Sequence, residues 1–124
     1  MVKTKKFAAL MPSLREKKRY IAFEIISEKP IMDFSKVSSA IWDSCLCYLG
    51  TLGVSKAGIW ILHDKYSPES QRGLIRVSRK EVDKVKAAFI TIRHIDDQDV
   101  IVRSLGVSGI LNKAEQKYLN TSSV

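Results

Sequence analysis

The chain has 124 residues, of which 45% are hydrophobic, so it fits one domain with a single core and is not a disordered tail. Its one apolar stretch near the start, residues 7–11, is ended by Pro12 and is too short for a signal peptide or a membrane span, which predicts a cytoplasmic protein. The formal net charge of +8 excludes an acidic domain and favours a polyanionic partner.

The positive charge is concentrated at the beginning of the chain. Residues 1–19 contain seven basic residues and one acidic residue, whereas the remaining 105 residues contain fourteen basic and twelve acidic ones. This distribution predicts a basic N-terminal arm over residues 1–19, followed by one nearly neutral domain over residues 20–124. Such an arm favours a nucleic-acid partner. A contribution to solubility alone is the other interpretation.

The first elements predicted are a strand and a helix. Arg19 to Ser27 is rich in aromatic and β-branched residues, which is typical of a strand. From Asp33 to Leu52 the apolar spacing changes to three and four, which indicates a helix capped by Asp33 or Ser35 and ended by Gly50 and Gly53. Its predicted buried face consists of Val37, Ile41, Cys45, Leu49 and Leu52.

Two further strands and a second helix are predicted after this point. Gly58–Tyr66 and Gly73–Val77 have strand composition, and a polar loop separates them. Ser78 and Glu81 have the spacing of a capping box, which predicts a helix start. The apolar face of that helix consists of Val82, Val85, Phe89 and Ile92.

The C-terminal part predicts a fourth strand and a last short helix. Residues 96–98 form a turn, residues 99–105 alternate as a strand, and residues 106–109 lead out of it. Asn112 is the expected cap of a helix that carries Ala114, Tyr118 and Leu119.

The predicted fold class is therefore α+β. The order β-α-β-β-α-β indicates a ferredoxin-like (RRM-like) sandwich, in which a four-stranded antiparallel sheet carries two helices on one face. A basic arm precedes this sandwich and a helix follows it. The first strand is apolar on both of its faces, so the second sheet face is also expected to be covered, either by terminal segments or by another protein.

No catalytic constellation is visible in the sequence. Cys45 and Cys47 are two apart in a predicted helix, so they point in different directions and neither pair with each other nor share a metal. The acidic cluster at residues 96–99 fits a turn better than a Mg²⁺ site. We therefore predict no catalytic residue, no metal ligand and no cofactor held by the protein.

The stretch from Arg72 to Arg79 is the most informative one. It lies where an RNA-recognition motif has its RNP1 strand, but the positions of the stacking aromatics hold Leu74, Arg76 and Arg79. Without rings there, the pattern predicts contacts to phosphates rather than bases. The residues expected to make them are Arg72, Arg76, Arg79, Lys80 and Arg103.

Five short motifs occur in an order that is typical of one family. They are LREKKRYI at 14–21, AIW at 40–42, GxxGxxKA at 50–57, GLIRVxR at 73–79 and VRxLGVSG at 102–109. In these motifs the chain resembles the archaeal ribonuclease P protein component 2 family, the archaeal and eukaryotic Pop5 proteins. The resemblance spans residues 14 to about 113.

This resemblance implies the same fold and a function as a non-catalytic protein subunit. Such a subunit binds the catalytic region of ribonuclease P RNA together with protein component 3, in one arrangement as a heterotetramer. The RNA uses Mg²⁺ to remove the 5′ leader of precursor tRNA. Precursor tRNA is therefore only an indirect partner of the protein. The resemblance places RNA contacts at Lys17, Lys18, Arg19, Arg76, Arg79 and Arg103, and also at Gly106, Ser108 and Gly109, where a simple turn is the alternative.

Two other functions stay open on the sequence alone. One is a ferredoxin-like regulatory module that binds a small anion or a protein and has no RNA function. The other is a stand-alone nuclease, which the missing acid–base and metal residues disfavour.

Overall fold

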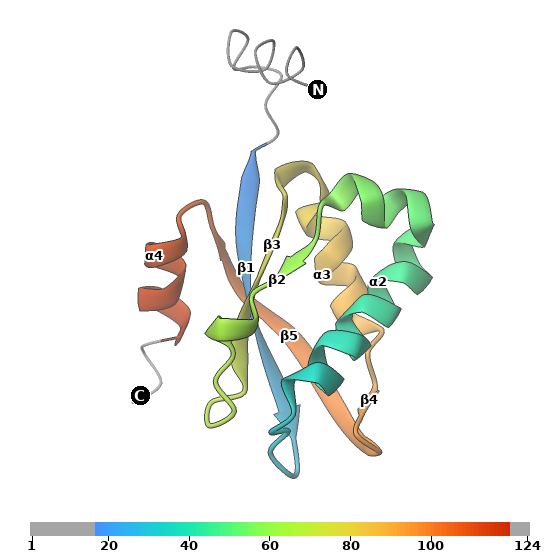
Figure 1. Ribbon diagram of the computed structural model, residues 1–124, viewed down its shortest axis with the longest axis vertical. Helices are drawn as coiled ribbons and strands as arrows, with labels where there is room; N and C mark the ends of the chain where they lie inside the picture. The colour runs from blue at the N-terminus through green and yellow to red at the C-terminus, as the bar shows by residue number, and fades with distance from the viewer. Residues whose placement is uncertain (1–16, 120–124) are drawn as a thin grey trace, which may run out of the picture.

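A five-stranded antiparallel sheet forms the centre of the computed structural model, which describes residues 17–119 (Figure 1). The strands follow the spatial order β2-β3-β1-β5-β4. Their bounds are β1 (Lys18–Ser27), β2 (Trp60–Ile61), β3 (Arg72–Ser78), β4 (His94–Ile95) and β5 (Gln98–Ser108). The α+β class is confirmed, but the predicted count of four strands is wrong. Asp96 and Asp97 adopt positive φ angles of 54° and 61°, and the resulting tight turn pairs β4 with the start of β5.

β1 is the central strand, because it pairs with β3 on one side and with β5 on the other. In this register Tyr20 lies opposite Arg76 on β3 and opposite Ser108 on β5. Successive side chains of a strand point to opposite faces, so the even-numbered residues of β1 and β3 share one face of the sheet.

Two helices, α2 (Phe34–Ala57) and α3 (Val82–Ile90), cover the other face and enclose the main core (Figure 1). Asp33 caps α2 as predicted, since its side chain accepts a 3.0 Å hydrogen bond from the Ser35 backbone N–H. The core includes Ile21, Phe23, Val37, Ile41, Cys45, Ile75, Val85 and Phe89.

The predicted end of α2 at Gly50 and Gly53 is wrong. Gly50 is non-helical, with φ 76° and ψ 171°, but the helix resumes after it and reaches Ala57. A φ in this range suits glycine because it has no Cβ. The break also rotates the second half of the helix about its axis, so Leu52 is 71% exposed instead of buried, and Ala57 is buried there.

Two predicted local structures differ in detail. The second strand is confined to Trp60–Ile61, because the chain turns at Leu62 into a 3₁₀ turn over His63–Lys65. The capping box at Ser78 and Glu81 is not formed. A 3₁₀ turn over Arg79–Glu81 comes before α3, and the Glu81 carboxylate forms an ion pair with Lys84.

The second face of the sheet is covered by the C-terminal segment, one of the two coverings considered above. α4 (Leu111–Ala114) continues into a π-turn (Glu115–Leu119), and both lie on the side of the sheet opposite α2 and α3 (Figure 1). The predicted cap at Asn112 is wrong, because the cap position is Ile110 and Asn112 is already within the helix. The buried centre of this second cluster is Ala22, Leu74 and Ala114, surrounded by Tyr20, Leu62, Leu105, Leu111, Tyr118 and Leu119.

Candidate nucleic-acid interface

Predicted RNA contacts from distant parts of the chain meet where β1 begins and β3 ends. Lys18 pairs with Ser78 in the β1–β3 register, and the Arg79 backbone N–H donates a 2.7 Å hydrogen bond to the Lys17 carbonyl. Lys17, Arg79 and Lys80 are exposed there. We call this region the cationic end of the sheet, and it comprises Lys17, Lys18, Arg19, Arg76, Arg79 and Lys80.

The end of β5 adjoins the cationic end. Ser108 pairs with Tyr20 in the sheet, and the Arg19 guanidinium lies beside Gly109, where a Cβ would be 3.5 Å from its nearest nitrogen. The Ser108 hydroxyl bonds to the backbone N–H and carbonyl of Ile110. The prediction of a turn over 106–109 is therefore only partly right, since Gly106 to Ser108 belong to β5.

Four of the cations at this end, Lys17, Arg76, Arg79 and Lys80, have no carboxylate partner in the part of the chain that the structure describes. The Arg76 guanidinium instead lies over the Trp60 ring, 5.4 Å from its centroid. Cations of this kind are suited to phosphates, because no intramolecular salt bridge has to break first.

The other two predicted arginines, Arg72 and Arg103, have a different environment. The two oxygens of the half-buried Glu24 carboxylate accept a 3.0 Å hydrogen bond from Arg72 Nε and a 2.9 Å bond from Arg103 Nε. Arg72 Nη1 also donates to the Tyr118 carbonyl at 3.0 Å, which ties β3 to the C-terminal segment. We call Arg72 and Arg103, together with the Glu24 carboxylate that joins them, the bridged arginine pair.

Glu24 is held in its charged form by this arrangement. Burial alone would raise the pKa of the carboxyl, but the hydrogen bonds from Arg72 and Arg103 and their positive charges outweigh it and lower the pKa below its ordinary value. The Glu24 charge thus neutralises one of the two arginine charges, and the three side chains together keep a net charge of about +1. The sequence predicted the same role for all these arginines. In the structure they fall into two groups, the cationic end and the bridged arginine pair.

Gly106 has a packing role that the sequence pattern did not indicate. A Cβ on this residue would lie 2.0 Å from the Tyr118 Oη, so only a glycine lets the Tyr118 ring lie flat against β5. This contact fixes the π-turn on the sheet. Whatever else Gly106 does, its lack of a side chain serves this packing.

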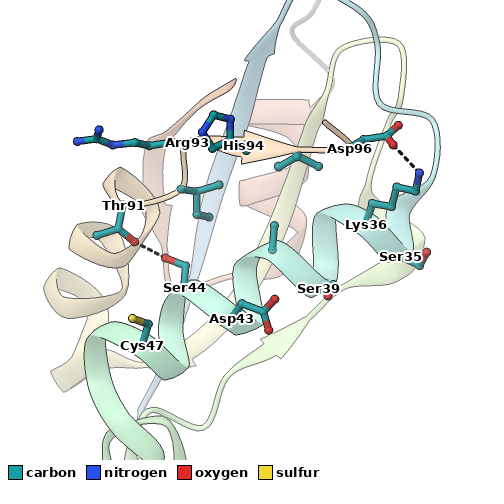
Figure 2. A pocket seen from close by; sticks show the side chains of 13 residues that line it. Ser35, Lys36, Ser39, Asp43, Ser44, Cys47, Thr91, Arg93, His94 and Asp96 are labelled. Carbon is teal, nitrogen blue, oxygen red and sulfur yellow. Dashed lines mark hydrogen bonds and ion pairs between the residues drawn. The ribbon is translucent and has the colours of Figure 1, made fainter. Parts of the chain in front are cut away.

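A hollow of about 930 Å³ lies between the first half of α2 and residues 91–96 (Figure 2). Figure 2 shows that polar side chains line it, and that two pairs of them, Ser44 with Thr91 and Lys36 with Asp96, contact each other. The Ser44 hydroxyl contacts the Ala88 carbonyl and the Thr91 hydroxyl, and Lys36 forms an ion pair with Asp96.

Over residues 17–119 there is no group of three or more His, Cys, Asp or Glu side chains placed to hold a metal ion. Asp99 contacts His94 Nδ1 at 2.8 Å on the surface. Burial raises the pKa of the Cys45 thiol to about 11, so it is not a thiolate at neutral pH, while Cys47 is exposed. In the described part of the chain, no helix combines the length and apolar character that a membrane span requires.

The fold and these residues define a small α+β protein with a cluster of cationic side chains at one end of its sheet. The family model of the Rpp14/Pop5 family matches residues 19–119. The chain therefore belongs to the Rpp14/Pop5 family.

Individual relatives agree with this assignment. The chain is 41% identical to Ribonuclease P protein component 2 of Thermococcus gammatolerans over 110 residues, covering 89% of each chain. It is 40% identical to the protein of the same name from Methanocaldococcus jannaschii over 110 residues, covering 89% of this chain and 78% of the relative.

A solved structure is similar in fold. A chain in the cryo-EM structure of yeast Ribonuclease MRP superimposes with a TM-score of 0.59 at 14% identity, covering 88% of this chain and 90% of that one. At this identity the similarity concerns the fold.

Proposed function

We propose that this protein is a subunit of ribonuclease P that binds the catalytic RNA and supports removal of the 5′ leader from precursor tRNA. The observation that carries the proposal is the cationic end, where Lys17, Arg76, Arg79 and Lys80 form no ion pair with an acidic side chain within residues 17–119. Family membership and the names of the relatives support the same function.

The contribution of the protein is electrostatic. A folded RNA brings phosphates close together, and lysine and arginine side chains at fixed positions reduce their mutual repulsion. The protein thereby stabilises the active RNA conformation and its Mg²⁺ sites. The chemistry belongs to the RNA and its Mg²⁺, and the polypeptide alone neither cleaves precursor tRNA nor binds a cofactor. The site of action is the cytoplasm.

The strand order supports a closer description of the fold. Without the added hairpin strand, the order is β2-β3-β1-β5, and both long helices cover one face. This is the arrangement that the ferredoxin-like sandwich requires. RNA-binding domains often use that sandwich, so the description agrees with the proposed function.

A protein partner belongs to this proposal as well. Leu46, Tyr48 and Leu52 on α2 are between 44% and 71% exposed, so this helix offers large apolar side chains to a protein partner. We infer that protein component 3 is the partner, and that a heterotetramer of the two proteins is one form of the complex.

The test is cleavage of precursor tRNA at limiting Mg²⁺ by ribonuclease P RNA, with and without this protein plus component 3. We expect faster cleavage that requires both the RNA and this chain. Component 3 is first shown to be active with the corresponding subunit of a relative. If this chain then adds nothing, the subunit assignment is wrong, and a regulatory module without RNA function becomes the better description. Cleavage by the protein alone would instead establish a stand-alone nuclease.

A further inference from the structure

Trp60 is a large aromatic side chain that the fold leaves in water. Its exposed fraction is 59%, although it lies in the sheet rather than in a loop. It pairs with Arg76 of β3 and so lies on the same face as the second cluster, which the C-terminal segment covers. That cover reaches Tyr20 and Leu62 but not Trp60. β2 is also the edge strand, so no further strand lies beyond the ring.

The Arg76 guanidinium contacts the Trp60 indole, and the polar surroundings of this arginine are incomplete. Its guanidinium carbon is 5.4 Å from the Trp60 ring centroid, in cation–π geometry. Its Nε is buried and has no hydrogen-bond partner, and no ion pair joins it to a carboxylate within residues 17–119. The contact orients a planar cation and a planar ring side by side. Within residues 17–119, neither the Arg76 guanidinium nor the Trp60 indole N–H forms a hydrogen bond or ion pair that would complete it.

Open space lies next to the ring. A hollow of about 210 Å³ runs beside β2 and is lined by Trp42, Ile59, Trp60, Ile61 and His63. Arg76 itself belongs to the cationic end, and Ser78, two residues later on β3, pairs with Lys18. An RNA strand bound by its phosphates at this end would pass within reach of Trp60.

We propose that Trp60 and Arg76 form a stacking site for one unpaired nucleobase of the bound RNA. The base lies against the part of the indole that Arg76 leaves open, and Arg76 contacts the adjoining phosphate. A ring stacks on any base, so the site selects single-stranded nucleotides over helices and has little sequence preference. This inference rests on the proposed function, and it revises the expectation that the sheet has no stacking ring. The RNP1-like strand, β3, carries no ring at its expected stacking positions, whereas this ring comes from β2.

Tryptophan fluorescence provides the direct test, because stacking of a base on an indole quenches its emission. The chain has two tryptophans, so Trp42→Phe makes Trp60 the only reporter. We expect a single-stranded oligoadenylate to quench this variant, and an abasic oligonucleotide of equal length, with the same phosphates, to leave it unquenched. If Trp42→Phe does not fold, the difference between the wild type and Trp60→Phe gives the same signal. Equal quenching by both oligonucleotides, or none by either, overturns the stacking site.

Affinity for ribonuclease P RNA provides the second test. Trp60→Leu keeps an apolar side chain and removes the ring, so we expect binding about tenfold weaker, while Trp60→Phe stays within about threefold of the wild type. The dependence on salt should be the same in all three, because no phosphate contact is lost. Unchanged affinity of Trp60→Leu contradicts the site while leaving the subunit function intact. Absence of RNA binding by the wild type contradicts the proposed function itself.

Discussion

Arg76 and Arg72 lie on the same strand and the same sheet face, four residues apart, but their environments are opposite. Arg72 shares the Glu24 carboxylate with Arg103, whereas Arg76 contacts only an indole ring. The distance between them along β3 is about 13 Å, so both are within reach of one RNA segment. Both residues are arginines, so the residue type does not decide whether the side chain is available to a phosphate. The intramolecular partner of the side chain decides it.

The largest effect is expected at the cationic end. Replacing Arg76 and Arg79 together with Ala removes two unpaired cations, so binding to ribonuclease P RNA should weaken by about 10- to 100-fold near 0.1 M salt. The slope of log affinity against log salt should flatten by about 1 to 2, since each lost phosphate contact contributes about 0.7–0.9. A filter-binding titration over several salt concentrations measures both quantities.

Arg103→Ala is the matched control from the bridged arginine pair. This side chain is 57% exposed and also cationic, but Glu24 already neutralises part of its charge. We expect its affinity to stay within about twofold of the wild type. If Arg103→Ala weakens binding as much as the double variant, the division into two groups of arginines is incorrect.

Gly106→Ala should produce the next largest effect, on stability rather than on RNA binding. The new Cβ would lie 2.0 Å from the Tyr118 Oη, so the C-terminal segment has to shift from the sheet. Overpacking of this kind costs about 1–3 kcal/mol in the free energy of unfolding. Chemical denaturation measures the loss.

Gly109→Ala is the control for that variant, because a Cβ there would meet its nearest atom at 3.5 Å, an ordinary contact. It should unfold like the wild type. Loss of RNA affinity in folded Gly106→Ala, without loss of stability, would instead mean that this part of the chain contacts RNA directly.

The order of the main elements was predictable from the sequence because their apolar periods are strong. Val37, Ile41 and Cys45 on α2, and Val85 and Phe89 on α3, are buried as the spacing of three and four requires. Asp33 is a correct cap because an aspartate before a helix bonds to the first free backbone N–H groups.

The errors came from interactions that a local pattern does not contain. Gly50 reads as a stop signal, but contacts of the later residues restart the helix and expose Leu52. Glu24 is separated by 48 residues from Arg72 and by 79 from Arg103, so sheet register alone brings them together. The exposed Trp60 was not predicted as a stacking ring because such rings were expected only within Arg72–Arg79. The signal available in the sequence was an aromatic residue in the predicted strand Gly58–Tyr66; its pairing with Arg76 follows only from the strand register.

Glu24→Gln tests the same difference by removing the carboxylate from the bridged arginine pair. It leaves two arginines without a carboxylate, so the protein should lose about 1–2 kcal/mol of unfolding free energy at pH 7. The released positive charge should at the same time strengthen RNA binding by a few fold and steepen its salt dependence by up to about 1. Asp96→Asn, which removes an exposed ion pair with Lys36 in the β4–β5 turn, away from the cationic end, is the control and should change both quantities little. Weaker RNA binding by Glu24→Gln would mean that the bridged arginine pair contacts RNA as a unit.

The smallest effect is the pH dependence of the same interaction. The two arginines lower the pKa of Glu24 below its ordinary value of 4.5, so the folded state favours the ionised carboxylate more than the unfolded state does. The stabilisation is therefore complete above pH 4.5 and is lost as the pH falls through the lowered pKa of the folded protein. Urea unfolding of the wild type and of Glu24→Gln between pH 7 and pH 3 should show a difference in unfolding free energy that shrinks toward acid. Asp33, whose pKa is lowered by its hydrogen bonds with Ser35, titrates in both proteins and cancels in the difference. A difference that stays constant across this range would mean that Glu24 contributes through its shape and hydrogen bonds, and that its charge does not set the properties of the bridged arginine pair.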